Sequence, residues 1–567
     1  MNAIQPIDHE RLLLERVREW EDQYNPDLKL LRVPFSSPGY HTTLKNVETV
    51  HGTYANLIYA LALLDTGLAE YERRAFDVIE TILPLQETDR SRDTFGIWPW
   101  FYEEPLERMA PPDWNWADFC GKQLLMAEYR HGPRIPEPLR SRIKQAIGNA
   151  CDAIIKRNVG PSYTNIAIMG ALVTLVAGEH YGIEAYADYG LRRLERFHEF
   201  TFELKTFQEY NSPTYAVVAI LELSRLRSMT ATPRAAQLSG DLLDLAWGMA
   251  AEHHHPATGQ WSGPHSRCYR TLLNEETKSF LQVATDGQVG FVAPERLRYS
   301  AEWYESGVSC PERYFPQFRE PRTVTVRRIY ARDLERGLEK EATSYMTPNY
   351  AIGTFRKDIM WNQCRNLVGY FDNGGSPTSI QLRVLHDGYD YCSAVFECIQ
   401  NGPDAVFGIR FLTEGGDTHP NLDKMHGTIE ASDLRIRLEI GGHRERVEVR
   451  SAGASAEIAI GGTTVKLQRL FASYHDGEQY MPVPEWSVLQ EEDTICLDFV
   501  LYEGSRRTFD FRTMAAGAFL FALSVGKPIP AYTVSAGKER ASVTADWSEE
   551  PRQLDIPIRP TAFSVRA

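Results

Sequence analysis

The sequence lacks the features that mark several classes of protein. Its 567 residues contain no apolar run of about 18 residues, so no membrane span is expected. The eight cysteines show no CxxC spacing, which favours reduced thiols over a disulfide framework. No apolar segment opens the chain, so we expect no secretory signal and a cytoplasmic location. The net charge of -15 lacks the basic excess of a nucleic-acid binder.

The composition that is present indicates a globular protein with more than one core. Apolar residues make up 43% of the chain and charged residues 24%, which is typical of soluble domains. A single hydrophobic core rarely serves a chain of this length, so two or more domains are expected.

Residues 1–308 are predicted to form one helix after another. Buried helices are expected where a segment is apolar nearly all round, and half-exposed helices where an apolar stripe alternates with charges. Three of the buried segments begin near residues 116, 164 and 212, at intervals of 48 residues, which is the period of a helical hairpin repeat. We therefore predict an incomplete (α/α) toroid with parallel inner helices. The buried segments are 51–67, 116–132, 163–182 and 211–226, and the amphipathic ones are 135–158 and 183–200.

The sequence period changes to that of strands beyond about residue 320. Apolar and polar residues alternate in 322–331, 434–442, 445–453 and 494–504, and Gly461-Gly462 separates two such runs within 456–471, which is a hairpin signal. Many short strands with glycine turns favour an antiparallel β-sandwich. The predicted organisation is a catalytic toroid over 1–308, a Pro-rich linker over 309–323 and a β-sandwich over 324–567.

Polar and aromatic residues gather where the buried helices are expected to start. Parallel inner helices would bring these starts to one rim, where unpaired N–H groups and helix dipoles favour an anion such as a sugar carboxylate. Simpler interpretations stay open, because Asn165 and Asn211 are also plausible helix N-caps and Tyr215 a plausible core residue. The residues at these starts are His51, Trp114, Asn115, Trp116, Tyr163, Asn165, Tyr210, Asn211 and Tyr215.

Two further loops add groups suited to an acidic sugar. Segments 93–105 and 111–119 hold Trp98, Trp100, Trp114 and Trp116, whose flat rings either stack on sugar rings or pack the loops down.

Segment 259–272 carries His265, Arg267 and Tyr269 around a Gly-Pro turn. Histidine exchanges protons near neutral pH, and arginine binds carboxylates in bidentate fashion. A structural role for His265 is the alternative. The run 253–255, three histidines without regular ligand spacing, is interpreted as a surface tract, with a zinc site as the weaker alternative, and we predict no metal site.

These motifs resemble those of the heparinase II/III and alginate-lyase-like superfamily of polysaccharide lyases, which join an α/α toroid to antiparallel sheets. In that family one inner helix begins with Asn or Asn-His, here "SYTNIAIMG", and a later one carries a tyrosine in its first turn, here "NSPTYAVVAIL". Tyr215 follows Asn165 by 50 residues, close to the family spacing. Segments 344–355 and 415–420 also look like pieces of related C-terminal domains. The chain departs from the family at Ile166, where many relatives have histidine.

The resemblance implies β-elimination at a 4-linked uronic acid, with an anionic oligosaccharide as substrate and no cofactor. Asn165, the helix N-termini and Arg267 would neutralise the carboxylate. Tyr215 or His265 would take the C5 proton, and His51 is the other candidate if the base is a histidine. Tyr215 or Tyr269 would protonate the leaving oxygen.

The residues proposed to bind the substrate are His51, Trp98, Trp100, Trp114, Asn115, Trp116, Tyr210 and Asn211.

Two other functions fit the same residues. A glycoside hydrolase on this fold would need two carboxylates, for which Asp113, Asp118 and Glu209 compete. A carbohydrate-binding protein without catalysis would keep the tryptophans and tolerate the loss of Tyr215.

Overall fold

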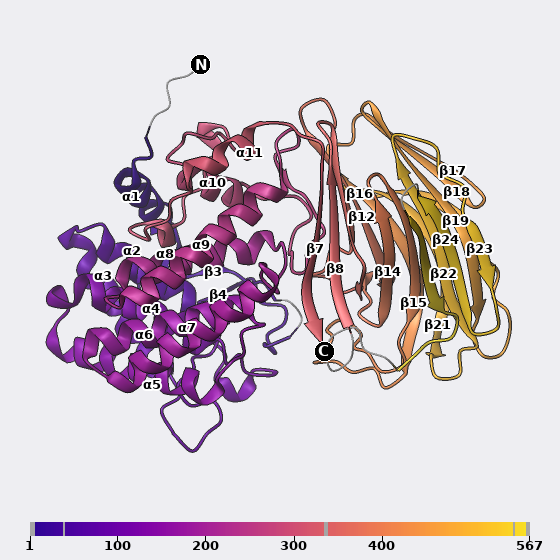
Figure 1. Ribbon diagram of the computed structural model, residues 1–567. Helices are drawn as coiled ribbons and strands as arrows, with labels where there is room; N and C mark the ends of the chain where they lie inside the picture. Colours follow the sequence, from indigo (N-terminus) through magenta and orange to yellow (C-terminus); the bar gives the residue numbers. More distant parts are fainter. Residues whose placement is uncertain (1–5, 38–39, 334–337, 548–549, 563–567) are drawn as a thin grey trace. The chain divides into compact units, whose positions relative to one another are not determined.

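A computed structural model describes residues 6–37, 40–333, 338–547 and 550–562 (Figure 1). The chain forms two compact units, each made of several segments. The helical unit comprises Met1–Gln208, Tyr215–Trp247 and Glu275–Glu312. The sheet unit comprises Glu209–Thr214, Gly248–Asn274 and Arg313–Ala567. The fold is therefore a helical N-terminal half and an antiparallel, sheet-rich C-terminal half, but segments 209–214 and 248–274, expected in the helical domain, belong with the sheets.

Helices occupy the places that the hydrophobic pattern predicts. The segments that are apolar all round form α2, α4, α6 and α8, and the amphipathic ones form α5 and α7. The helices are α1 (His9–Glu19), α2 (Thr53–Asp65), α3 (Ala69–Ile82), α4 (Trp116–His131), α5 (Glu137–Arg157), α6 (Thr164–Tyr181), α7 (Glu184–Leu204), α8 (Pro213–Met229), α9 (Pro233–His253), α10 (Glu275–Ala284) and α11 (Phe315–Arg319).

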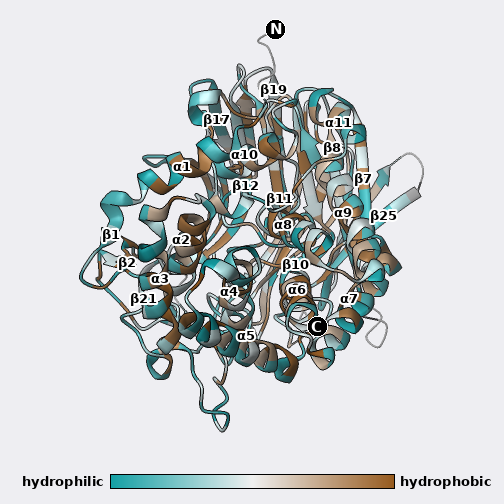
Figure 2. Cartoon of the chain, turned by 90° about the vertical axis from the view of Figure 1, so that its left-hand side faces the viewer, coloured by the Kyte–Doolittle hydropathy of each residue, from teal (hydrophilic) through white to brown (hydrophobic). Residues whose placement is uncertain are grey.

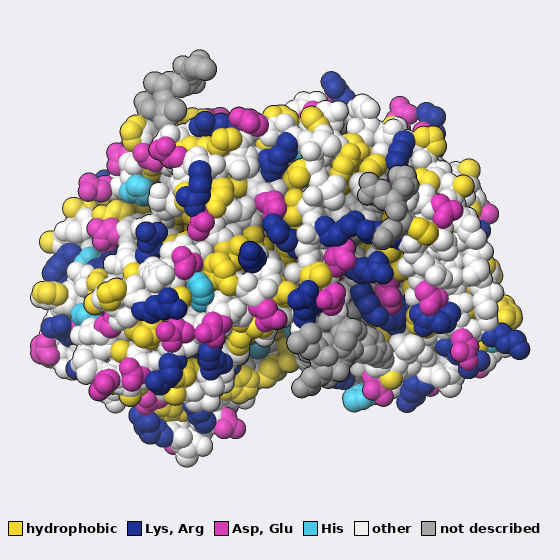
Figure 3. All heavy atoms as spheres, in the orientation of Figure 1, with side chains coloured by type: hydrophobic (Ala, Val, Ile, Leu, Met, Phe, Trp, Pro, Cys, Tyr) yellow, Lys and Arg dark blue, Asp and Glu magenta, His cyan; other side chains and the backbone are white. Residues whose placement is uncertain are grey.

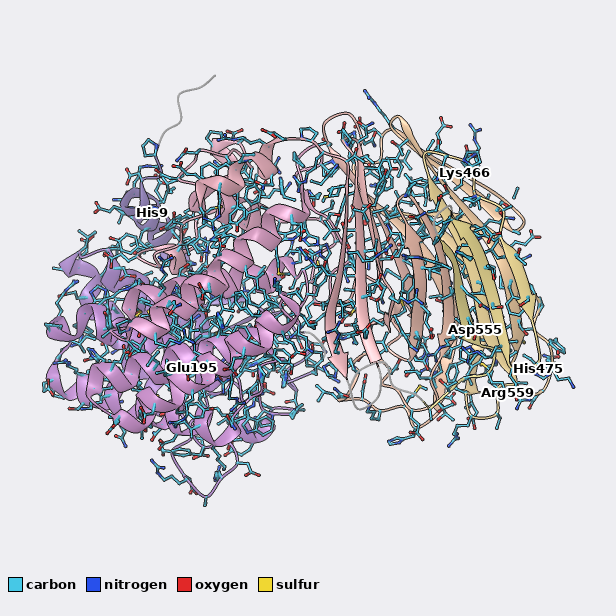
Figure 4. All side chains as sticks on the ribbon, viewed as in Figure 1. His9, Glu195, Lys466, His475, Asp555 and Arg559 are labelled. Carbon is cyan, nitrogen blue, oxygen red and sulfur yellow. The ribbon has the colours of Figure 1, made fainter. Side chains whose placement is uncertain are left out.

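The buried helices lie inside the amphipathic ones. In the end-on view, α2, α4 and α6 lie inside α3, α5 and α7 (Figure 2), and each inner helix packs on the outer helix that follows it. Helix α4 also contacts both α2 and α6. Nearly every side chain of α6 from Thr164 to Gly178 is buried, whereas α7 keeps a partly exposed face that includes Glu195, labelled in Figure 4. The predicted difference between the two helix classes is confirmed.

Two glycines let α6 and α7 approach closely. A Cβ atom at Gly178 would lie 2.2 Å from the Ala187 backbone nitrogen, and one at Gly190 would lie 2.5 Å from that of Leu175. Because such distances are too short for any side chain, each helix offers its neighbour a bare backbone. The pair is thereby held at one register.

A buried network of four charges ties the interior of the helical unit together. The Lys122 ammonium, on α4, donates to Glu222 on α8 (2.7 Å), to Glu302 (3.2 Å) and to the Tyr54 hydroxyl on α2 (2.9 Å). Arg225 donates to both oxygens of Glu222. Burial alone would raise the pKa of Glu302, but Lys122 and Arg225 lower it to about 2. The network balances two positive against two negative charges and so tolerates burial.

This balance predicts strong coupling between Lys122 and Glu222. Lys122→Met should lower the free energy of unfolding by about 3–5 kcal/mol, because it leaves two carboxylates to one guanidinium. Glu222→Gln should cost a similar amount, and the double variant less than the sum of the two, by at least about 1 kcal/mol. Urea denaturation followed by circular dichroism measures all three.

The exposed pair Arg11–Glu15 provides the control for this cycle. Arg11→Met should change the unfolding free energy by less than about 0.5 kcal/mol, since exposed pairs contribute little. Strictly additive losses at Lys122 and Glu222 would contradict a charge-balanced network.

Antiparallel strands build the sheet unit (Figure 1). A nine-stranded sheet among the described residues runs β20 (Trp486–Gln490), β21 (Ile495–Asp510), β16 (Thr428–Gly442), β12 (Pro377–His386), β11 (Leu367–Asp372), β9 (Tyr350–Phe355), β8 (Leu338–Met346) and β7 (Val324–Asp333), with β13 (Tyr389–Asp390) beside β12. A seven-stranded sheet runs β10 (Lys357–Ile359), β14 (Ala394–Asn401), β15 (Asp404–Phe411), β22 (Ala516–Val525), β19 (Thr463–His475), β18 (Ser455–Ile460) and β17 (Val447–Ala452).

The two large sheets share one hydrophobic core. Phe499 on β21 contacts Phe519 and Phe521 on β22, with ring centroids 5.7 and 5.4 Å apart. A smaller sheet of β23 (Thr533–Ala536), β24 (Arg540–Trp547) and β25 (Glu550–Pro557) covers the other face of the seven-stranded sheet. Because both faces are covered, β15 and β22 are buried at every residue and are mostly apolar, without the alternation of a half-exposed strand.

Local predictions for this half can be checked strand by strand. The predicted hairpin at Gly461-Gly462 is confirmed, since β18 pairs with β19 and Gly461 has a φ of 57°. The four alternating segments form β7, β16, β17 and β21, as predicted. Segment 309–323, expected as a plain linker, contains the short helix α11. Lys466 on β19 and Asp555 on β25 are labelled in Figure 4.

The interpretation of 253–255 as a surface tract is wrong. His253, His254 and His255 are all buried, and His255 bonds to Thr258 and to the Thr347 carbonyl. These residues lie at the end of α9 and in β5 (His254–His255), which pairs with β6 (Gln260–Trp261).

Short strand pairs also join β1 (Tyr24–Asn25) to β2 (Leu30–Leu31) and β3 (Val33–Pro34) to β4 (Thr49–Val50).

The remaining global features concern thiols, membranes and charge. All eight cysteines are free and buried. Within the described ranges, no helix combines the length and the apolar character that crossing a membrane requires. On the visible face of the helical unit, acidic and basic side chains are interspersed (Figure 3).

Candidate active site

Three inner helices of the helical unit begin side by side. The Trp116 indole nitrogen, at the start of α4, donates to the Thr53 hydroxyl at the start of α2 (3.0 Å). The Asn115 amide donates to the hydroxyl of Tyr163, the residue before α6 (3.3 Å). We call the surface around Thr53, Asn115, Trp116 and Tyr163 the N-terminal rim. It gathers helix starts that lie far apart in the sequence.

Asn115 does not cap its own helix. Although Asn115 occupies the N-cap position of α4, its side chain makes no capping hydrogen bond. Its amide instead bridges Tyr163 and Arg157, whose guanidinium donates to the Asn115 oxygen at 2.6 Å. Arg157 is exposed, and none of the described residues gives it a carboxylate partner. The rim therefore presents a cation that an amide holds in place.

The four tryptophans have different environments. Trp100 and Trp116 lie 5.2 Å apart at 34° and are half-buried, and His41 packs on Trp100 at 5.0 Å. Trp114 is 36% exposed, whereas Trp98 is completely buried and offers no face to a ligand. A sugar-stacking surface at the rim is thus limited to three of the four predicted rings.

His51 is oriented by a carboxylate that the sequence did not single out. Its Nδ1 atom lies 2.5 Å from Glu103 Oε1, and its backbone N–H donates to the same carboxylate. The carboxylate only accepts, so Nδ1 carries the proton. Nε2 then faces the Asn25 amide at 3.4 Å. This arrangement fixes the tautomer of an imidazole located immediately before α2.

The two residues that carry the family resemblance stand in first turns. Asn165 is the second residue of α6 and is 1% exposed, while Tyr215 is the third residue of α8 and half-buried. Beneath the start of α6, the Arg193 guanidinium donates to the carbonyls of Ile166 and Ala167.

Asp118 is a buried carboxyl group one turn below Asn115 on α4. It is 2% exposed, and in the described structure its Oδ1 atom has no hydrogen-bond partner. Burial raises its pKa to about 7, although Arg193 and Arg157 act in the opposite direction. Buried oxygens without partners are rare in folded proteins.

Within the sheet unit, Asn211 is held on every side. Its side chain donates to the carbonyls of Ser262 and Pro264 and accepts from Trp261, and its φ is 48°. Asparagine tolerates this left-handed conformation better than most residues. The amide is fully used and buried, which leaves no group for a ligand.

His265 is enclosed beside Asn211. It has no exposed surface, its Nδ1 lies 2.6 Å from the Asn211 carbonyl, and its Nε2 lies 3.2 Å from the Tyr370 hydroxyl. Burial lowers its pKa to about 3, against the hydrogen bond to Asn211, which favours the charged form. The ring is therefore neutral at physiological pH, with the proton on Nδ1.

Arg267 and Tyr269 form a second polar group in the sheet unit. Arg267 donates to Glu209 (2.9 Å) and to Gln363 (3.0 Å), and it lies 3.4 Å from the hydroxyl of Tyr269, which is 50% exposed. The guanidinium already binds a carboxylate. Tyr210 follows Glu209, and its carbonyl accepts hydrogen bonds from Ser266, but its side chain is completely buried, with the hydroxyl bonded to His253 and the ring stacked on Tyr330.

Sequence reasoning missed Arg157, Glu103 and His41. Arg157 falls in the charged last turn of an amphipathic helix, and such charges usually indicate a solvated face. Glu103 and His41 lie in loops, where spacing carries no periodic signal.

Among the described residues, no group of three or more His, Cys, Asp and Glu side chains is arranged to hold a metal ion.

Comparisons with known proteins give a limited result. A family model described as a domain of unknown function (DUF8769) matches residues 22–290. No curated protein matches.

Solved structures that are similar to this chain include that of heparinase III, at 10% identity and a TM-score of 0.47, covering 98% of this chain and 92% of that one. Another is the chondroitin AC lyase of Streptomyces coelicolor A3 in complex with chondroitin sulphate, at 10% identity and a TM-score of 0.49, covering 94% and 83%. A third is a heparan sulfate lyase mutant from Pedobacter heparinus, at 10% identity and a TM-score of 0.35, covering 99% and 91%. Likenesses at this level assign no activity and no substrate.

The enclosure of His265 predicts that it does not titrate in the physiological range. Its ring nitrogens should keep the chemical shifts of the neutral Nδ1–H tautomer from pH 5 to pH 8, because burial holds its pKa near 3. Nitrogen NMR of the histidine-labelled protein, assigned with a His265→Gln variant, measures this. A titration midpoint between pH 5 and pH 8 would show that the ring is accessible.

The burial of Asp118 predicts a pH-dependent stability. Its folded-state pKa lies above its unfolded value, so its contribution is complete below about pH 4 and is lost as the pH rises through 7. Asp118→Asn removes this dependence. Relative to the wild type, the variant should gain on the order of 4 kcal/mol in unfolding free energy between pH 4 and pH 8.

Asp188 supplies a control on the exposed side of α7. For Asp188→Asn the difference from the wild type should stay constant over the same pH range. If Asp118→Asn behaves like this control in urea denaturation, Asp118 ionises with a pKa close to that of a solvated carboxyl.

Proposed function

We propose that this chain is a lyase that cleaves a 4-linked uronic-acid glycosidic bond by β-elimination, on an incomplete (α/α) toroid joined to a β-sandwich. The observation that supports it best is the N-terminal rim, where hydrogen bonds join Thr53 to Trp116 and Asn115 to Tyr163. Three helix starts at one place make a surface suited to an anion. We propose that the substrate is an anionic oligosaccharide and that the protein acts on it in the cytoplasm.

Elimination needs a neutralised carboxylate first. The C5 proton of a uronate is too weakly acidic to be removed while the adjacent carboxylate keeps its full charge. We assign neutralisation to Asn165 and the first turn of α6, where Arg193 binds the carbonyls of Ile166 and Ala167. Because Asn165 is only 1% exposed, this role requires a local opening when the substrate binds. Arg267 is a weaker candidate, because a substrate carboxylate would have to displace Glu209 from its guanidinium.

Proton transfer is assigned to tyrosine. Tyr215, as the phenolate, takes the C5 proton, the C4–O bond breaks as the C4–C5 double bond forms, and the leaving oxygen receives that proton from Tyr215, which returns to the phenolate. Tyr215 is half-buried, and Tyr269, the other tyrosine considered as the acid, belongs to the sheet unit. The reaction consumes no water and requires no cofactor.

His265 and Asn211 act as positioning residues in this proposal. The neutral, enclosed imidazole binds the Asn211 carbonyl, and the Asn211 amide binds two further carbonyls. Together they fix the chain at Asn211 within the sheet unit. Of the histidines considered for proton transfer, His51 keeps the better geometry, because Glu103 orients it and its Nε2 has only a long contact to Asn25.

A glycoside hydrolase is less well supported. Asp113 accepts from the Trp100 indole and the Asn115 N–H, and Glu209 is paired with Arg267. Of the three competing carboxylates, Asp118 has a buried oxygen to which no described residue donates a hydrogen bond. Inverting and retaining hydrolases both need two carboxyl groups across the bond. A carbohydrate-binding protein without catalysis would need only the rim.

The decisive experiment is product analysis over a panel of uronate oligosaccharides. We expect ultraviolet-absorbing unsaturated products whose summed mass equals that of the substrate. Hydrolysis would add one water to that sum. Tyr215→Phe should lower kcat/KM by a factor of about 10²–10⁴ because it removes the proton-transferring group.

Tyr129→Phe is the matched control, since this tyrosine lies near the opposite end of α4 and is exposed. It should keep wild-type kcat/KM. Products heavier by one water, or a Tyr215→Phe variant with unchanged turnover, would overturn the proposal.

A further inference from the structure

Arg157, which forms a polar pair with Asn115 at the rim, has no role in the proposed reaction so far. Arg157 ends α5, and its guanidinium donates to the Asn115 oxygen at 2.6 Å. One hydrogen bond to a neutral amide uses only one of the five N–H donors of an arginine. The remaining donors have the fork geometry that matches a carboxylate.

Beneath this pair lies the carboxyl group of Asp118, one oxygen of which has no hydrogen-bond partner in the described structure. Residues three apart on a helix are neighbours on one face, so Asp118 is one turn below Asn115. Asp118 is only 2% exposed, and its Oδ1 atom has no hydrogen-bond partner in the described structure. Its electrostatic neighbours include both Arg157 and Arg193. The unpartnered Asp118 oxygen near Arg157 and Arg193 is therefore a second observation, independent of the Arg157–Asn115 pair, that points to a ligand site at the rim.

The charged and titratable groups around Asp118 come from several elements. Arg157 and Cys151 are on α5, Arg193 is on α7, and Asp113 precedes α4. Tyr163, joined to Asn115, precedes α6. The positive side of this balance depends on the two arginines. An anion that binds Arg157 would cancel part of it.

We propose that Arg157 and Asn115 form a subsite for a sugar carboxylate, and that Asp118 beneath them takes up a proton when the carboxylate binds. The inference rests on the proposed function for the identity of its ligand, an acidic sugar. It goes beyond that function by naming the residues that hold the charge and the proton that is linked to binding.

Proton uptake follows from electrostatics. A bound carboxylate weakens the stabilisation that Arg157 gives to ionised Asp118 and adds a repulsion of its own, so the pKa of Asp118 rises further. At a pH just above 7, a few tenths of a proton should then be bound with each ligand. Affinity should fall as the pH rises, by up to about tenfold for each unit by which the pKa shifts.

The test is isothermal titration calorimetry of a uronate trisaccharide in buffers of different ionisation enthalpy. The full chain carries Tyr215→Phe so that turnover does not disturb the heats. We expect trisaccharide binding to be accompanied by proton uptake at pH 7.5. This uptake should disappear when Asp118→Asn is combined with Tyr215→Phe. Arg157→Gln should weaken the binding of the trisaccharide at least about tenfold and leave the weaker binding of its carboxyl-reduced counterpart unchanged.

Arg142 gives the matched control, because it is another exposed arginine of α5. Arg142→Gln makes the same charge change and should leave affinity and proton uptake as they are. Equal losses in Arg142→Gln and Arg157→Gln would reduce the effect to general charge and overturn the subsite. Unchanged proton uptake in Asp118→Asn would overturn the linkage.

These experiments can reject the subsite and the lyase activity independently of each other. Trisaccharide binding with Asp118-dependent proton uptake, but without unsaturated products from the chain that retains Tyr215, would support the subsite and reject the lyase. Unsaturated products together with wild-type binding in Arg157→Gln and Asp118→Asn would support the lyase and reject the subsite.

Discussion

The buried ammonium of Lys122 is the constraint on which the helical unit depends. A lysine without water needs charged partners, and here they come from α8 and from Glu302, with a hydroxyl from α2. These contacts fix how far α2, α4 and α8 can slide past one another. Tyr54 immediately follows Thr53, and Trp116 is less than two turns before Lys122, so the same register sets the level of the N-terminal rim.

The period of the sequence was sufficient to locate the inner helices, two of the outer helices and several of the strands. Helix α6 is apolar on all sides and α7 on one, and the structure buries them accordingly. The Gly461-Gly462 hairpin needed only local turn chemistry. Segments 209–214 and 248–274 could not be assigned to the sheet unit, because their hydrogen bonds, such as those from Asn211 to Ser262 and Pro264, join distant residues and leave no periodic trace.

The candidate site was predictable only as a set of helix starts. Asn115 and Trp116 could be placed at such a start, but not the direction in which Asn115 points, and therefore not its partner Arg157. His265 was attractive as a base because histidine titrates near neutral pH. Its enclosure removes that property, and only the packing around it reveals this.

The rim and the loop around Asn211 show opposite uses of polar side chains. At Asn211 and His265, the side-chain polar atoms find partners inside the sheet unit, which gives rigidity. At the rim, Asn115 leaves its own helix uncapped and Asp118 keeps a buried oxygen without a partner. Both features cost stability that a simple cap and an apolar residue would recover. Sequences keep such local conflicts mainly where function requires them, and for this reason the proposed chemistry is assigned to the rim.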